Sequence, residues 1–363
     1  MGVLTDSTLT APPELAAQNV GPQPGSGPKS LLSVVDRPVD RTAADAADRV
    51  AETVRDLTGT LDTGLLTGPL RPLWQRLAAL GHADLTVARL AEGHIDAVRI
   101  LHEAGRAPAP GTVYGVWASA SGGTGLKATR SESGWVVDGT MRFCSGAWFL
   151  DRALTVVATD EGRLLIDIEA QNPALTRLDD TWPALGMDAS RSVDIEVRGL
   201  AVPTSAAVGG PGFYLGRPGF TLGGAGVAAV WLGGAHGVLH SLLATADPAR
   251  ASAHHRTHLG AMAIAIAAAD ALLGELADTV TAGHDLDLAD ITAVRSAVEL
   301  AVAEVLTRAP RVTGPNGLGR NGEIAHRIAD LGVYVRQHHA EADYELVGAQ
   351  LLESGTLLGR SFR

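Results

Sequence analysis

The sequence predicts an α+β protein built from three successive blocks: a helical N-terminal block, a middle block of short strands and a C-terminal set of four helices. Apolar residues recur at helical spacing before about residue 106 and again after residue 216. Between these blocks, turn residues separate short apolar runs, as is typical of an antiparallel β domain. The chain has 363 residues, of which 46% are hydrophobic, so it is long enough to bury a sizeable core.

Four segments follow from these patterns: a flexible leader over residues 1–40, a helical domain over 41–113, a β domain over 114–215 and a four-helix bundle over 216–363. The leader is rich in Pro, Gly and Ser and has no hydrophobic period. In the helical domain, 85–101 is a long predicted helix, and its Glu92-Gly93-His94 triplet is interpreted as a capping or packing feature.

The β domain contains one stretch, residues 134–147, in which a strand, a turn and a loop of small residues follow each other directly. Asp138-Gly139 predicts a hairpin turn, because this dipeptide supplies the positive φ angles that such a turn needs. The loop Cys144-Ser145-Gly146-Ala147 would let a flat ring approach the backbone, with the Ser145 hydroxyl available to its edge. A simple tight connection is the alternative interpretation of this loop.

The C-terminal block contains four long helical segments, predicted over residues 222–246, 252–282, 290–308 and 323–353. Because their connections are short, an antiparallel bundle is expected. The stretch 222–243 is apolar but consists mostly of Gly and Ala and carries two His, so no membrane span is predicted.

Charge and cysteine content exclude several classes of function. The net charge is −11 and no run of Lys or Arg occurs, which argues against a nucleic-acid partner. The single cysteine, Cys144, excludes an intrachain disulfide and suits a reducing cytoplasm. His254 and His258 stand four residues apart on a predicted helix, but without the acid of an H-E-x-x-H pattern they predict no metal site.

Four motifs carry a resemblance to one family. Residues 139–147, GTMRFCSGA, are similar to its G-x-K-x-W-I-T-N-A stretch, and residues 186–203 are similar to its G-x-x-x-S-x-T strand ending in V-x-V-P. Residues 256–260, RTHLG, resemble its R-x-x-F-G, and residues 314–318, GPNGL, resemble its G-G-x-G-F turn. In order and spacing, the chain resembles the acyl-CoA dehydrogenase flavoproteins. The resemblance implies an N-terminal α domain, a central antiparallel β-barrel-like domain, a C-terminal four-helix bundle and an FAD cofactor.

The resemblance also implies which residues contact the FAD. Residues bordering the flavin ring would be Phe143, Cys144 and Ser145, with Ser119 and Ser121 in the loop beneath it, although that loop lacks the family's Glu and Pro. The diphosphate would lie on the backbone N–H groups of Gly314 and Gly317.

Arg256 would reach the FAD of a neighbouring subunit, which implies a homodimer or homotetramer. Arg311 stands where the family commonly has Gln, so altered contacts are expected there.

The family's catalytic Glu is absent. Counting without gaps from Gly314 places that position on His338, with Glu341 nearby, and the family's second position falls around Gly223. In one interpretation His338 or Glu341 is the base for α,β-dehydrogenation of an acyl thioester or a related small molecule. In another, the flavin serves a monooxygenase or oxidase, and in a third the histidines are structural. A catalytically degenerate FAD-binding or scaffold protein is the non-enzymatic alternative.

Overall fold

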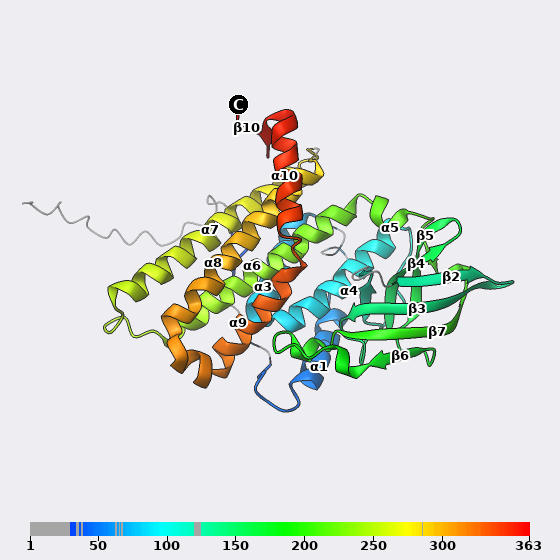
Figure 1. The fold of residues 1–363 in the computed structure, drawn as a ribbon, viewed down its shortest axis with the longest axis horizontal. Coiled ribbons are helices and arrows are strands. Elements are labelled where there is room, and N and C mark those ends of the chain that lie inside the picture. The colour runs from blue at the N-terminus through cyan, green and yellow to red at the C-terminus, as the bar shows by residue number, and fades with distance from the viewer. Residues whose placement is uncertain are drawn as a thin grey trace, which may run out of the picture.

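The computed structural model describes residues 30–363, apart from residues 34–35, 38, 62–63, 65, 67, 120–124 and 285. A helical body adjoins a β-sheet at one end, and helix α4 reaches from the body toward the sheet (Figure 1). The N-terminal helices described are α1 (Ala46–Gly59), α3 (Leu70–Ala83) and α4 (Leu85–Glu103). The predicted leader, residues 1–40, lies mostly outside the described residues.

The sheet follows α4. Its strands are β1 (Tyr114–Trp117), β2 (Gly125–Arg130), β3 (Gly134–Cys144), β4 (Arg152–Thr159), β5 (Gly162–Glu169), β6 (Leu175–Leu178), β7 (Val193–Pro203) and β8 (Ala207–Val208). They pair in the order β6-β7-β3-β2-β4-β5-β8, and β1 joins through β4. The pairs β1–β4 and β2–β4 are parallel, so the described sheet is mixed rather than wholly antiparallel as expected.

The predicted hairpin turn at Asp138-Gly139 is wrong, because β3 runs through it without a break. The positive φ angle of Gly139, 134°, serves a bulge in the pairing of β3 with β7 instead. A Cβ atom at Gly139 would lie 2.3 Å from the carbonyl oxygen of Gly125, so the neighbouring strand β2 also requires glycine there. The chain turns earlier, between β2 and β3.

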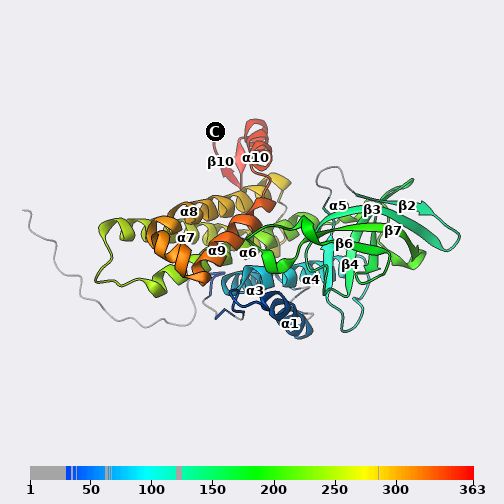
Figure 2. The same cartoon turned by 60° about the horizontal axis from the view of Figure 1, so that its bottom comes forward.

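Long helices form the C-terminal part. They are α6 (Gly219–Thr245), α7 (Ala253–Thr281), α8 (Leu288–Arg320) and α9 (Gly322–Tyr334), followed by α10 (Glu341–Ser354); the short helix α5 (Phe213–Gly216) precedes them, and β9 (Thr356–Leu357) and β10 (Arg360–Ser361) end the chain. The predicted fourth helix, 323–353, is therefore two helices. The break falls at Ala340, whose φ of 50° no α-helix accommodates. In both views α10 projects from the side of the body opposite α1 (Figures 1 and 2).

Helix α6 is the centre of the helical body, and small residues let its neighbours come close. A Cβ atom at Gly233 would lie 2.0 Å from the carbonyl oxygen of Ala78 in α3, and one at Gly81 of α3 would lie 2.2 Å from that of Val230. Backbone therefore meets backbone along this contact, with Trp74 and Trp231 among the largest buried side chains beside it. The glycines of α6 are a packing requirement of the bundle.

By length and composition, both α6 and α7 could cross a membrane. The most apolar part of α6 is 72% buried within the protein, whereas that of α7 is 33% buried. The core helix of a helical bundle is also apolar on all sides, and α6 is such a core helix in this fold.

Candidate functional site

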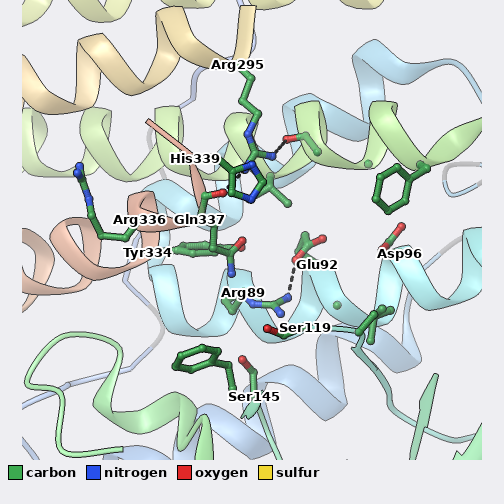
Figure 3. A pocket seen from close by; sticks show the side chains of 18 of the residues that line it. Arg89, Glu92, Asp96, Ser119, Ser145, Arg295, Tyr334, Arg336, Gln337 and His339 are labelled. Carbon is green, nitrogen blue, oxygen red and sulfur yellow. Dashed lines mark hydrogen bonds and ion pairs between the residues drawn. The ribbon is translucent and has the colours of Figure 1, made fainter. Parts of the chain in front are cut away.

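A cavity of about 950 Å³ lies where α4, the sheet and the C-terminal helices meet (Figure 3). This volume falls within the range of about 300 to 1,000 Å³ typical of sites for small molecules and cofactors. The end of β3 and the segments before and after the 3-10 turn η3 (Asp188–Ser190) form one wall. Helix α4 forms a second wall, and the beginning of α6 together with α8, α9 and α10 form the rest.

The wall contributed by the sheet is made of hydroxyls and one exposed ring. Ser145 and Ser192 share a hydrogen bond of 2.8 Å between their hydroxyls, and Ser190 continues the chain with a 2.7 Å bond to Ser192. All three serines line the cavity and are buried. Linked hydroxyls can donate or accept at a ligand's edge by rotating their hydrogens, so this wall suits a ring with both kinds of polar atom.

Phe143 lies beside these serines in a backbone conformation that is unusual for its residue type. Its φ is 59°, and its side chain is 47% exposed although it faces the cavity. It meets Trp182 edge to face, with ring centroids 6.3 Å apart. A non-glycine residue held in the left-handed region costs on the order of 1–3 kcal/mol, and such strain concentrates at ligand-binding sites.

Helix α4 presents charged side chains to the cavity at helical spacing. Arg89, Glu92 and Asp96 all line it, and an ion pair of 2.7 Å joins Arg89 to Glu92 (Figure 3). Burial raises the pKa of Glu92 to about 7 against the opposing effect of Arg89, and burial also raises the pKa of Asp96. Asp96 instead pairs with Arg217 at 3.3 Å, and Arg217 contacts Glu103 at 3.0 Å.

Two further polar side chains enter from the C-terminal helices. Arg295 of α8 donates hydrogen bonds to the backbone oxygens of Gly224 and Gln337, and its guanidinium lies 4.7 Å from the centre of the Trp231 ring. The hydroxyl of Tyr334, at the end of α9, is buried, and the side chain within hydrogen-bonding reach of it is Glu92, although the geometry of that contact is not ideal. Burial raises the pKa of Tyr334, which keeps this hydroxyl protonated.

A buried ion-pair network holds the elements of these walls together. The Arg41 guanidinium contacts Asp84, which caps α4, Asp330 of α9 and Asp188 of η3. Asp188, His326 and Asp330 lie within 4.8 Å of one another and could hold a metal by distance alone. Because Arg41 already binds both of these carboxylates, its guanidinium supplies the positive charge that a metal would bring.

No protein family model and no curated protein matches this chain. Solved structures do match. FMN-bound TdsC from Paenibacillus, a dibenzothiophene monooxygenase, has a TM-score of 0.69 at 17% identity, over 88% of this chain and 98% of its own. Glutaryl-CoA dehydrogenase from Mycobacterium smegmatis has a TM-score of 0.70 at 17% identity, over 88% of this chain and 96% of its own.

XiaF from Streptomyces, solved with FADH2 and glycerol, has a TM-score of 0.69 at 18% identity, over 85% of this chain and 88% of its own. The chain has the acyl-CoA dehydrogenase fold. At these identities the likeness concerns the arrangement of the elements, and the chemistry of the site depends on the residues of this chain.

Within the acyl-CoA dehydrogenase fold, the structure brings three of the predicted flavin contacts together. Phe143, Ser145 and Ser119 line the cavity. Cys144 does not, because consecutive strand residues point to opposite faces and its thiol is buried in the core of the sheet, where burial raises its pKa. Ser121 lies outside the described residues.

The two predicted bases do not line the cavity. His338 is buried; its Nδ1 accepts from the amide of Ala340 at 3.0 Å, and its Nε2 lies 2.9 Å from the Ser296 hydroxyl and 3.3 Å from an Asp343 oxygen. Both ring nitrogens are thus engaged within the protein, and the geometry gives His338 a structural role where α9 leads to α10. Glu341 is exposed on the first turn of α10.

The predicted diphosphate and subunit contacts lie elsewhere, along α7 and α8. Arg256 and Arg311 are exposed, and none of the four residues Arg256, Arg311, Gly314 and Gly317 lines the cavity. Gly314, with φ 60° and ψ −171°, interrupts α8, and Pro315 follows it. The next long helix, α9, begins at Gly322 and is capped by Asn321 rather than by the glycine turn.

Sequence reasoning missed the charged wall. The sequence predicts Glu92 only as part of a capping or packing triplet, and it predicts no role for Arg89, Asp96, Arg295 or Tyr334. A signal was present: Arg89, Glu92 and Asp96 recur at helical spacing within a stretch whose other residues are mostly apolar. Charged residues at buried helix positions predict a site or an ion-pair network, although which of the two depends on neighbours from other segments.

Proposed function

We propose that this protein is a flavin-dependent oxidoreductase and that the isoalloxazine ring binds in the cavity against Phe143 and Ser145. The observation that carries the proposal is the cavity itself, which has the volume of a cofactor site and is bordered by the loop that resembles the family's flavin-contacting stretch. TdsC with FMN and XiaF with FADH2, which share the fold, support a flavin as the ligand class.

The residues present fit such a group. The linked hydroxyls of Ser145, Ser190 and Ser192 would bond the polar edge of the ring, while Phe143 and Trp182 would cover its apolar part. A bound flavin would supply hydride or oxygen chemistry. The chain's own contribution is to orient the ring, to exclude water from it and to place Glu92 and Arg295 in the same cavity.

FAD is the proposed form of the cofactor, and it rests on the sequence resemblance. Arg256, Gly314 and Gly317 do not line the cavity of a single chain. Their predicted roles therefore require a second copy of the chain, whose α7 and α8 would meet the adenosine part. A homodimer or homotetramer in the cytoplasm is the state we propose for the working protein.

Within this class, the lining favours a monooxygenase or oxidase over α,β-dehydrogenation of a fatty acyl thioester. The two positions that hold the family's Glu are occupied by His338 and by the region of Gly223, and neither offers a carboxylate. An alkyl chain would also have to remove water from the Arg89 guanidinium, which lines the cavity and is 17% exposed, and this is costly.

Flavin titration tests the proposal. Purified protein should quench the fluorescence of added FAD or FMN at a stoichiometry of one per chain, and Ser145→Leu should weaken binding roughly tenfold or more, since a clash costing about 1.4 kcal/mol has that effect. Ser205→Leu, at an exposed serine outside the cavity, is the matched control. Binding of neither flavin would refute the proposal. If an acyl-CoA bleaches the absorbance of the bound flavin under anaerobic conditions, the protein is a dehydrogenase rather than a monooxygenase or oxidase.

A further inference from the structure

Glu92 is distinguished from the other carboxylates of the cavity by its environment. Its side chain is 9% exposed, and its partners among the described residues are Arg89, an ion pair on the preceding turn of α4, and the hydroxyl of Tyr334. Asp96 is 22% exposed and contacts Arg217. Asp343, at the edge of the cavity, is engaged by His338 and His339. Glu92 is therefore the deeply placed carboxylate that a ligand in the cavity can reach without breaking a larger network.

The charged and titratable groups that face Glu92 come from several elements. Arg89 and Asp96 belong to α4 itself, Arg295 faces it from α8, and Tyr334 faces it from α9. Tyr214 of α5 is also close enough to be influenced by Glu92. Two of these neighbours are guanidinium groups and one is a carboxylate. This balance leaves the site able to hold either protonation state of Glu92 near neutral pH.

Arg295 is the second unusual group. Among the residues that the structure describes, it forms no ion pair, and its guanidinium donates hydrogen bonds to two backbone oxygens. Its guanidinium stacks on Trp231 and lines the cavity, where burial lowers its pKa against the weaker opposing effects of Asp343, Tyr334 and Glu92. A partly buried cation that has nearby carboxylates but no direct ion pair can receive an anion bound in the cavity.

We infer that Glu92 is a general base for a weakly acidic substrate and that Arg295 receives the anion formed. The ligand class is a phenol, and the inference rests on the proposed flavin chemistry of the same cavity. In the step, the phenolic O–H bond of the substrate breaks and the proton passes to a carboxylate oxygen of Glu92. The electron pair stays on the substrate, whose negative charge faces Arg295.

This assignment fits the charge balance of the cavity. Transfer of the proton converts a carboxylate and a neutral ligand into a neutral acid and an anion, so the net charge within the cavity does not change. The negative charge moves from the vicinity of Arg89 toward Arg295, which forms no ion pair in the described part of the chain. An electron-rich anion next to a flavin is the reactant that both hydroxylation and oxidation of such compounds require.

The test uses 4-nitrophenol, whose phenolate is coloured and whose own ionisation lies near neutrality. Calorimetry at about pH 8, in two buffers of different ionisation enthalpy, measures the protons taken up on binding, and difference absorbance shows whether the bound probe is the phenolate. Purified chain is used with and without saturating FAD. Wild-type protein should take up close to one proton per bound probe while the probe stays coloured.

Matched variants separate this role from a structural one. Glu92→Gln should still bind the coloured phenolate but without proton uptake, whereas Asp167→Asn, at a buried ion-paired carboxylate of the sheet, should leave uptake unchanged. Arg295→Met should weaken binding roughly tenfold or more, a loss of about 1.4 kcal/mol. Arg320→Met, at an exposed arginine at the other end of α8, is its control.

Failure of the probe to bind, binding as colourless phenol, or uptake that persists in Glu92→Gln would overturn the inference. If Glu92→Gln does not fold, Arg295→Met decides by its effect on affinity. Flavin binding is measured separately. A chain that binds FAD but takes up no proton therefore refutes the role of Glu92 alone, whereas a chain that binds no flavin refutes the proposed function.

Discussion

Arg41→Met should strongly destabilise the protein, and the effect should depend on pH. The Arg41 side chain is 1% exposed and contacts Asp84 and Asp330, which are 0% and 1% exposed. In the variant Asp84 keeps Arg37, at 3.1 Å, but Asp330 loses its cationic partner and retains a hydrogen bond from the amide of Met187. Leaving one buried charge uncompensated costs about 3–5 kcal/mol.

The sign of the pH dependence follows from Asp330. Burial raises its pKa to about 6, and the opposing effect of Arg41 would be absent from the variant. Because the folded pKa lies above the unfolded value of about 3.9, protonated Asp330 favours the folded state. This stabilisation is fully present below the unfolded pKa and is lost as the pH rises through the folded pKa. The deficit of Arg41→Met should therefore be largest above about pH 7 and shrink as the pH falls.

Urea unfolding at about pH 5 and pH 8 measures this difference. Arg49→Met is the control, because the Arg49–Asp45 pair on α1 is more than half exposed on both sides and should contribute nothing measurable. If the free energy of unfolding falls by less than about 1 kcal/mol at pH 8, or by the same amount at both pH values, the Arg41 network does not stabilise the protein through Asp330. Since Arg41 joins α4, η3 and α9, flavin affinity should fall together with stability.

Three further predictions concern other parts of the chain. Gly233→Ala should lower the free energy of unfolding by at least about 2 kcal/mol, because its Cβ would overlap the α3 backbone, whereas Gly332→Ala, with open space at that position, should not; urea titration compares them. Arg256→Ala should weaken FAD binding more than FMN binding in a fluorescence titration, and equal effects would remove its proposed contact with the adenosine part. His338→Ala should lower the melting temperature by several degrees but leave flavin affinity unchanged, because its ring nitrogens serve buried protein partners.

Much of the fold could be predicted because its signals are local. Helical periodicity located the C-terminal helices, and the small residues after Phe143 marked the loop that borders the cavity. The errors arose where a local signal has two outcomes. Asp138-Gly139 fixes a positive φ, but whether that angle makes a hairpin or a bulge depends on the strand opposite. The break at Ala340 likewise carries no glycine or proline to announce it.

The sequence by itself determined the order of helical and β blocks and the hydroxyl-rich loop, since backbone propensity and side-chain period act between near neighbours. Only the tertiary structure decided which charges share the cavity. Glu92 on α4 is some 200 residues or more along the chain from Arg295 on α8 and Tyr334 on α9. The three meet because α4, α8 and α9 all pack on α6. Electrostatic interactions depend on distance in space and on burial, and neither quantity can be obtained from the spacing of residues along the chain.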